Sequence, residues 1–479
     1  MADFSVIAAS PAIRAIVQEN LLERAFHDAL FPKMLFRGEA EVVAWPAHVG
    51  DSMAFTGVGL MGVDMKPIAP GADPLPASYT YEQWTAQLNQ YANSIDTNMP
   101  TSVNAIADLF LRNAQQLGLN AAQTLNRKAR NSLYNAAMAG STMAAGAQSA
   151  VTSLRVLRID GFTRARNPNL SGGSAVRFAA VSSSNPLAIL VNEGTLAAPS
   201  YTSVNVIGFV ADTAGDEFGP GVLTLSAAVT VVDQAGVLAA DRSHQVRVAS
   251  AAGKDAQTDD AIAAGDELRL KHIRAAVARF RQQNVPEYAD GFYHCHLDPV
   301  SEAQIFNDDQ FARLLTSLPD YYMYKQFSIG QLLGVAFMRN TECPVPETVR
   351  GSGTAYSGSG SYNYSVEDDF GGIIWNKQNV QIHRALFTGQ QALNEYYQDL
   401  SQYISDAGLN GKVAAPQITN NGIEVFSDRI QLVMRAPLNR LQDVVSTSWK
   451  WVGDFVVRTD AATGDAARYK RELVIAHGE

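Results

Sequence analysis

The chain has 479 residues, of which 47% are hydrophobic and 18% charged, so it can bury large cores and is not disordered overall. Its formal net charge of -10 argues against a protein that mainly grips nucleic acid through phosphate contacts, and two cysteines are too few for a secreted disulfide scaffold. No basic leader with an apolar core opens the sequence, and no apolar run approaches the ~18 residues of a membrane span, so we expect a soluble, cytoplasmic product.

An N-terminal arm with one amphipathic helix over residues 11–30 precedes a segment that contains G-x-G-x-x-G, at Gly57, Gly59 and Gly62. A dinucleotide-binding fingerprint needs a helix directly after its last glycine. The residues that follow here, V-D-M-K-P-I-A-P-G-A-D-P, cannot start one. The segment therefore predicts a flexible loop tip between two long strands. Its apolar side chains, Phe55, Leu60 and Met61, are expected to be exposed and to need a partner that covers them.

The strongest helical pattern runs from Thr101 to about Gly140, on the order of 60 Å at ~1.5 Å per residue. Apolar residues recur along it at three- and four-residue steps, among them Val103, Ile106, Phe110, Leu117 and Leu125. Its polar side carries four basic residues: Arg112, Arg127, Lys128 and Arg130. Two interpretations of that basic face remain open, a solvated surface and a surface that faces a polyanion.

Residues 151–257 are rich in Val, Ser, Ala, Thr and Gly, with short alternating runs between turn clusters, which predicts a separate β-rich domain inserted between helical segments. A second helix is expected from about Asp259 to Gln283. Its apolar stripe is opposite a basic face, made of Arg269, Lys271, Arg274, Arg279 and Arg281. A buried strand, G-F-Y-H-C-H-L-D-P, and several C-terminal strands complete the chain.

The best constellation for chemistry is His294, His296 and Asp298, because alternate residues of a strand share a face. An H-x-H pair with a carboxylate is a workable metal site. The competing interpretation is that Asp298, which precedes a proline, caps the next turn. Cys295 points to the opposite face as a small buried hydrophobe. No Walker A, H-E-x-x-H or C-x-x-C motif and no serine-hydrolase elbow occurs, so we expect no enzyme activity and no cofactor.

Three segments, in this order, resemble the major capsid proteins of tailed bacteriophages, which have the Hong Kong 97-type fold. The first is Y-E-Q-W-T-A-Q-L-N-Q-Y-A-N-S-I-D, which leads into the long helix. The second is D-G-F-Y-H-C-H-L-D-P-V-S-E-A-Q-I-F, similar to the family's strand, turn and short helix, and the third is F-S-I-G-Q-L-L-G-V-A-F-M-R-N-T. Nearly all the chain outside residues 151–257 is covered.

The resemblance implies an α+β fold with an inserted β-rich domain. Its parts would be an N-terminal arm (1–40), an extension loop (41–96), a peripheral domain with the spine helix (97–150), the insert (151–257), an axial domain (258–430) and C-terminal strands of the peripheral domain (431–479). Phe55, Leu60, Met61, Lys66 and Trp84 would meet the neighbouring subunit, with Lys66 a candidate for the covalent cross-linking known in part of the family. The four basic residues of the spine helix would face packaged DNA.

The resemblance also implies partners and a location. Copies of the chain would form the pentamers and hexamers of an icosahedral shell around dsDNA, in a virion assembled in the host cytoplasm. A portal, a separate scaffolding protein and a decoration protein are further candidate partners, whereas no membrane is expected. The alternatives are the shell protein of an encapsulin-type compartment and a β-rich adhesin or decoration protein.

Overall fold

The structure is a computed structural model of the 479-residue chain. It describes residues 35–46, 49–61, 71, 73, 79–98, 106–166, 178–196, 198–214, 218–239, 246–248, 259–263, 265–316, 330–344, 376–377, 380–398, 417–419, 422–427, 429–435, 444–458 and 470–479. The predicted arm helix over residues 11–30 lies outside these ranges. The chain is mixed α+β, mostly sheets with few helices, as the sequence predicts.

Two compact units divide the chain. Unit 1 combines Met1–Phe55, Thr85–Arg130 and Leu393–Val456, and unit 2 combines Thr56–Trp84, Asn131–Ala392 and Val457–Glu479. Each unit is thus assembled from segments that are distant in the sequence. None of the helices in the described residues is long and apolar enough to cross a bilayer.

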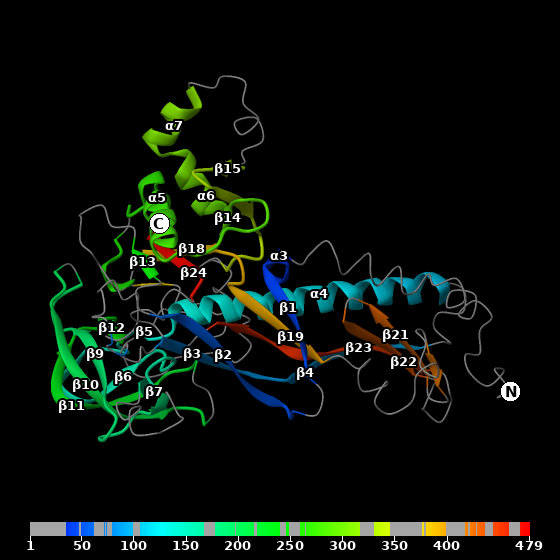
Figure 1. The fold of residues 1–479 in the computed structure, drawn as a ribbon, viewed down its shortest axis with the longest axis horizontal. Helices are drawn as coiled ribbons and strands as arrows, with labels where there is room; N and C mark the ends of the chain where they lie inside the picture. Colours follow the sequence, from blue (N-terminus) through cyan, green and yellow to red (C-terminus); the bar gives the residue numbers. More distant parts are fainter. Residues whose placement is uncertain are drawn as a thin grey trace. The chain divides into compact units, whose positions relative to one another are not determined.

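The long helix is α4, Ile106–Met138, whose 33 residues span about 50 Å. It is the longest helix drawn in Figure 1. Leu117, Ala121 and Leu125 are almost fully buried, which is the three- and four-residue stripe expected of a helix packed on one side. Gly140 follows with a φ of 78°, the left-handed backbone that commonly ends a helix.

The sheet of unit 1 has a strictly alternating strand at its centre. Its path is β1 (Ala40–Trp45), β19 (Leu393–Gln398), β23 (Val444–Val457), β22 (Ile430–Arg435), β21 (Gly422–Ser427) and β20 (Gln417–Thr419), and β4 (Asn89–Asn98) also pairs with β23. Every second residue of β23 is buried, including Trp449, Trp451 and Phe455. The Trp449 Nε1–H donates to Asn120 Oδ1 on α4 at 3.0 Å, so the buried face of β23 is the one covered by the helix.

Unit 2 contains a six-stranded antiparallel sheet with a closed apolar core. Its order is β5 (Ser141–Met143), β12 (Gly236–Ala239), β9 (Leu187–Asn192), β10 (Tyr201–Ala211), β11 (Gly221–Val231) and β6 (Gln148–Val156), beside a small hairpin of β7 (Arg164–Arg166) and β8 (Phe178–Ala180). Leu154, Ile189, Val206 and Leu223 lie in its core. These are the short strands predicted for residues 151–257, although the sheet takes its first strand from Ser141.

A second sheet of unit 2 carries the strand, turn and short helix of residues 293–306. It runs β13 (Val246–Val248), β24 (Glu472–Gly478), β18 (Val380–Thr388), β14 (Tyr293–Leu297), β16 (Val335–Arg339) and β15 (Gln331–Leu332), and β17 (Asn376–Lys377) pairs with β18. Helices α5 (Leu270–Gln282), α6 (Pro299–Phe306) and α7 (Asp309–Thr316) accompany it (Figure 1). Tyr293, Cys295 and Leu297 are buried in its core, so Cys295 is the small buried hydrophobe predicted.

Two boundaries differ from the sequence-based expectation. The helix expected from Asp259 is only a single 3-10 turn, η5 (Asp259–Ala261), and α5 begins at Leu270. The interruption has a local cause, because Gly265 takes a φ of 92° and the Asp266 carboxylate accepts the Ala263 N–H at 2.9 Å. The range 431–479 is also divided, since β22 and β23 pair in unit 1 whereas β24 pairs with β18 in unit 2.

Candidate functional site

The predicted loop is a hairpin of two long strands, β2 (Ser52–Met61) and β3 (Tyr79–Gln87), which form a two-stranded sheet of their own. Gly57 and Gly59 lie inside β2, in extended backbone, rather than at the start of a helix. This agrees with the rejection of a dinucleotide site. The residues around Gly62 lie outside the described part of the chain.

The root of this hairpin is an aromatic cluster within unit 1. The Phe55 ring stacks on that of Tyr396 with centroids 4.4 Å apart, and Trp45 meets the two rings edge-on at 6.0 and 6.1 Å. Trp45 Nε1–H also donates to the Gly50 carbonyl at 2.9 Å. Phe55, expected to be exposed, is partly buried, because it packs on Tyr396 of β19 and Trp45 of β1, and its contact with a neighbouring subunit stays a prediction.

Backbone hydrogen bonds fix the same root from the β3 side. The Asp454 carboxylate accepts the backbone N–H of Gln87 at 3.0 Å and that of Phe455 at 2.9 Å. Burial raises the pKa of Asp454, and the two hydrogen bonds and the charge of Lys128 act against that rise. The Leu88 N–H donates to the Asp51 carbonyl at 2.8 Å, which closes the base between the two strands. The hairpin therefore starts from a rigid base.

Trp84 was expected to meet a neighbouring subunit, but it is only 8% exposed in its own chain. The Arg458 guanidinium lies 5.9 Å from its ring centroid, which is cation–π distance. The chain's own side chains therefore cover most of the Trp84 ring, and a contact with a neighbouring subunit stays a prediction. The side chains of Leu60, Met61 and Lys66 lie outside the described residues.

The basic side of α4 is less continuous than the sequence suggests. Arg112 and Lys128 are exposed, and the Lys128 ammonium lies 4.9 Å from the Tyr91 ring centroid. Arg127 is half-buried. Arg130 is only 2% exposed, so its assignment to a DNA-facing surface was wrong. Arg130 belongs to the buried side of α4, four residues after the buried Asn126 and four before the buried Tyr134. The side chains of Val103, Ile106 and Phe110 lie outside the described residues.

A short helix, α3 (Leu35–Gly38), joins the chain before β1 to unit 1 through contacts that sequence reasoning missed. Phe36 is fully buried, and its N–H donates to Asn126 Oδ1 on α4 at 2.8 Å. Arg37 pairs with Glu395 through two hydrogen bonds of 2.6 and 2.9 Å, with both side chains almost fully buried. Residues 358 positions apart carry no local signal of such a pair.

His294, His296 and Asp298 do not converge on a metal site. His294 Nε2 lies 3.0 Å from Asp290 Oδ2, and its ring stacks on Tyr288 at 3.9 Å. His296 is fully buried, with Nδ1 3.5 Å from the Asn340 side-chain amide. Asp298 is the N-cap residue of α6, and its carboxylate accepts the Ser301 hydroxyl, but it makes no cap hydrogen bond to the helix backbone, so the expected turn cap is not formed by this side chain. Within the described ranges no group of three or more His, Cys, Asp or Glu could hold a metal ion.

Asp298 instead belongs to a buried polar network that links α6, β18 and β24. Its Oδ2 lies 2.8 Å from His383 Nδ1, and His383 Nε2 lies 3.0 Å from Glu479 Oε2. Ser301 Oγ lies 2.8 Å from His477 Nε2, and the two imidazole rings stack with centroids 5.6 Å apart. Since Ser301 is fully buried, the network ties elements together rather than presenting a nucleophile.

The two histidines of this network have opposite pKa shifts. Burial disfavours the charge on His383, but the hydrogen bond and charge of Asp298, helped by Glu479, raise its pKa above the usual value. For His477 burial dominates and lowers the pKa to about 3, with His383 adding repulsion. For Asp298 burial opposes ionisation, yet His383 and Ser301 lower the pKa of the carboxyl.

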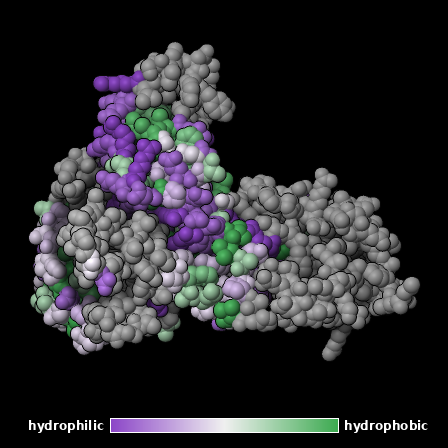
Figure 2. Space-filling view, in the orientation of Figure 1, coloured by the Kyte–Doolittle hydropathy of each residue, from purple (hydrophilic) through white to green (hydrophobic). Residues whose placement is uncertain are grey.

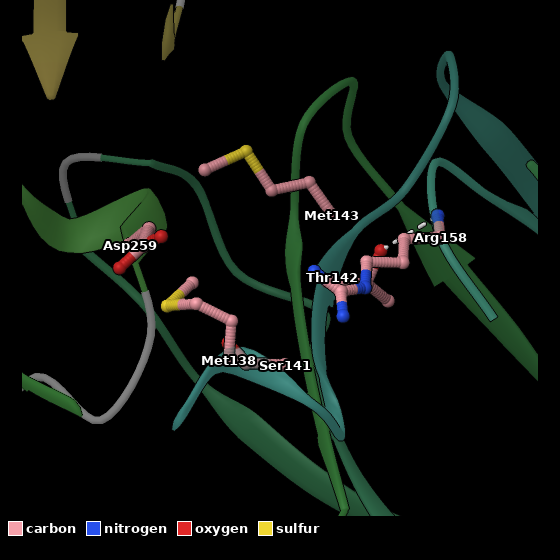
Figure 3. A pocket seen from close by; sticks show the side chains of 6 residues that line it. All are labelled: Met138, Ser141, Thr142, Met143, Arg158 and Asp259. Atoms are coloured by element: carbon pink, nitrogen blue, oxygen red, sulfur yellow. Dashed lines mark hydrogen bonds between the residues drawn. The ribbon is translucent and has the colours of Figure 1, made fainter. Parts of the chain in front are cut away.

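A small pocket in unit 2 is shown in Figure 3. Its cavity volume is about 10 Å³, and it is lined by Met138, Ser141, Thr142, Met143, Arg158 and Asp259. Arg158 pairs with Asp160, and Asp259 pairs with Arg384. The volume is below the ~300–1,000 Å³ of ordinary small-molecule sites. The pocket therefore suits ordered water between charged side chains better than an organic ligand.

No protein-family model matches the sequence, and no curated protein matches it. Solved structures do match, over nearly the whole length of the chain. The capsid of the cyanophage P-SCSP1u is 10% identical, with 92% of this chain and 87% of that chain covered and a TM-score of 0.44. The capsid of Ralstonia phage GP4 is 11% identical, with 91% and 85% covered and a TM-score of 0.42.

The capsid of cyanophage Pam1 is 8% identical, with 94% of this chain and 92% of that chain covered and a TM-score of 0.48. The solved structures that this chain resembles are phage capsids.

Proposed function

We propose that the chain is the major capsid protein of a tailed phage and that its copies assemble into the icosahedral shell around a dsDNA genome. The observation that carries the proposal is the β2–β3 hairpin, whose strands pair only with each other among the described strands. Its root is fixed by Phe55, Tyr396 and Trp45, and its strands extend beyond that root. A long hairpin without a sheet to join is a liability in a monomer and is covered when it lies on another copy.

Apolar surface near the start of unit 1 supports the same proposal. Leu35, Val42 and Val49 are 43%, 45% and 47% exposed. Val42 lies on β1, which is an edge strand of the unit 1 sheet and pairs only with β19 there. In a closed shell each subunit gives one surface and receives a different one, so such patches are buried by neighbours. The interfaces of obligate assemblies commonly exceed ~2,000 Å².

The proposal includes the remaining partners. Copies of the chain form pentamers and hexamers, a portal and a separate scaffolding protein take part in assembly in the host cytoplasm, and a decoration protein is a further candidate. Leu60, Met61 and Lys66 meet the neighbouring subunit from the distal half of the hairpin. The chain is structural rather than catalytic, with no cofactor, and residues 151–257 form an inserted domain on a Hong Kong 97-type fold.

Electron microscopy of the expressed full chain tests the proposal, alone and with the adjacent scaffold candidate from the same genome. Closed polyhedral shells, tubes or curved sheets are expected. A monodisperse monomer under both conditions, at all concentrations, overturns it. Nuclease-protected DNA in particles from infected cells distinguishes a virion shell from an encapsulin-type compartment, which would hold cargo protein instead. A β-rich adhesin or decoration protein would not account for α4 and its sheet.

A further inference from the structure

Helix α5 has an exposed basic face without acidic residues of its own. Five Lys or Arg and no Asp or Glu lie between Leu268 and Pro286, in a chain of net charge -10. Its apolar stripe, Leu270, Ile273, Ala276, Val277 and Phe280, is buried in the core of the second sheet of unit 2. Lys271, Arg274 and Arg281 are exposed on the opposite side. In Figure 2, hydrophilic residues cover the surface around α5.

The spacing makes this face a continuous stripe. Lys271, Arg274, Ala278 and Arg281 follow one another at steps of three, four and three residues, which is one side of a helix. From Lys271 to Arg281 the stripe measures about 15 Å at ~1.5 Å per residue. The residues between the charges, Ala275 and Ala278, are exposed and small, so a long partner can approach the helix closely.

Two neighbouring acids lie near the ends of the stripe. Glu267 lies 3.7 Å from Arg269, and Glu287 lies 3.6 Å from Arg281, which are long and solvent-exposed pairs of small energetic value. Asp308 accepts the Leu270 N–H at 2.7 Å and so is engaged at the helix N-terminus. Arg274, at the middle of the helix, donates to the side-chain oxygen of Gln310 at 2.9 Å. Because Gln310 is neutral, this hydrogen bond leaves the positive charge of Arg274 in place.

We infer that the basic face of α5, formed by Lys271, Arg274 and Arg281, binds the phosphate backbone of double-stranded DNA without reading its sequence. B-DNA carries about one charge per 1.7 Å, so a 15 Å stripe lies opposite about nine phosphates. Guanidinium groups match phosphate oxygens bidentately. The identity of the polyanion as packaged DNA rests on the proposed function. The existence of the basic face depends only on the residues of α5. We propose this face as the DNA contact in place of the basic side of α4, where Arg130 is buried.

The test measures binding of the purified full chain to two 30-bp duplexes of unrelated sequence by fluorescence anisotropy between 50 and 300 mM NaCl. The variant combines Lys271→Gln, Arg274→Gln and Arg281→Gln, which keeps good helix formers at exposed positions. The matched control combines Arg155→Gln, Arg164→Gln and Lys450→Gln, which removes the same charge from exposed or half-buried sites elsewhere. Circular dichroism and thermal melting confirm that both variants fold like the wild type.

The wild type is expected to bind both duplexes equally. The α5 variant is expected to bind about tenfold more weakly or worse at 100 mM NaCl, with a salt slope shallower by about 2.7 for three lost phosphate contacts. The control is expected to bind like the wild type. The inference is overturned if the α5 variant binds within twofold of the wild type, or if the control weakens equally, since net charge alone would then decide.

Assembly keeps this inference separate from the proposed function. If the α5 variant forms shells but holds as much DNA as the wild type, the inference fails and the shell proposal stands. If the chain never assembles but loses DNA binding only in the α5 variant, the shell proposal fails and the inference stands. A change in self-association of the α5 variant with unchanged DNA binding means that the face contacts another copy, which also overturns the inference.

Discussion

The guanidinium of Arg37 donates two hydrogen bonds, of 2.6 and 2.9 Å, to the carboxylate of Glu395, and both side chains are at most 2% exposed. Arg429 Nη2 lies 3.7 Å from the same carboxylate. The pair joins α3, the first described element, to β19, far along the chain. The pair holds α3 against the sheet of unit 1.

Replacing Glu395 with Gln should therefore destabilise unit 1. The substitution leaves the Arg37 charge buried without its counter-ion, and breaking a buried pair in this way costs about 3–5 kcal/mol. Differential scanning calorimetry measures the loss. The double variant Arg37→Met with Glu395→Leu should recover much of it, because well-packed apolar residues tolerate such sites.

The matched control is Arg155→Gln, which removes an ion pair with Asp212 whose side chains are 45% and 32% exposed. Exposed pairs contribute about 0–1 kcal/mol, so its melting temperature should hardly change. Equal losses for Glu395→Gln and Arg155→Gln would show that burial of the Arg37 pair has no energetic consequence.

The two network histidines should respond to pH in opposite directions. The pKa of His383 is raised by folding, so its contribution to stability is complete below pH ~6.5 and is lost as pH rises through the raised pKa. The pKa of His477 is lowered to about 3, so the unfolded chain binds more protons below pH ~6.5 and stability falls as pH drops from there towards 3.

Thermal melting of His383→Gln and His477→Gln between pH 4 and 8 separates the two effects. His477→Gln should flatten the acid side of the profile, since Ser301 gives its one hydroxyl proton to Asp298 and the Gln amide N–H can still donate to Ser301 Oγ without titrating. His383→Gln should lower stability most below pH 6.5. Parallel pH profiles for wild type and both variants would contradict the assignment.

The core stripe of α4 should be sensitive to truncation. Leu125 is fully buried, and Leu125→Ala is expected to lower the free energy of unfolding by about 2–5 kcal/mol through lost burial and the cavity left behind. Arg112→Ala, at an exposed position of the same helix, should change it by less than about 0.5 kcal/mol. Calorimetry of the two variants side by side gives the comparison, and similar values would mean that α4 is not packed along Leu125.

The distal hairpin should cross-link between copies. Both native cysteines are buried, with Cys295 0% and Cys343 4% exposed, so an introduced thiol reacts selectively. Met61→Cys, treated with a short bis-maleimide after assembly, should give covalent dimers and higher multimers on denaturing gels. Ala86→Cys, at a position 1% exposed in the hairpin root, should stay monomeric. Monomers only from Met61→Cys in assembled particles would place the hairpin tip on its own chain.

The sequence predicted the elements that have long, regular patterns. The apolar steps of α4, including Leu117 and Leu125, and the alternation of β23 around Trp449 and Trp451 each depend on one packed face, which a period reveals. The strands of the C-terminal range pair in two sheets, which the sequence did not indicate, because strand-like residues do not say which sheet they join. Thus β23 and β24 are both apolar, yet they pair in different sheets.

The side chains of the site were harder to predict. Phe55 was expected to be exposed, but it packs in part on Tyr396, and the Trp84 ring lies at cation–π distance from Arg458, and both partners are distant in sequence. The histidines on β14 drew attention through their spacing, whereas the partners of Asp298 include His383 on β18, where no motif marks it. Such contacts join residues that are distant in the chain, and a single sequence has no local pattern that predicts them.

The strict alternation along β23 has a consequence for the wall of the proposed shell. Its outward side chains include Ser446, Ser448 and Lys450, next to Gln90 and Ser94 of β4, so that side of the sheet stays in water at little cost. The buried face of β23 then needs only one covering layer, which α4 supplies. With packed layers about 10 Å apart, a container built this way encloses a large volume with little protein.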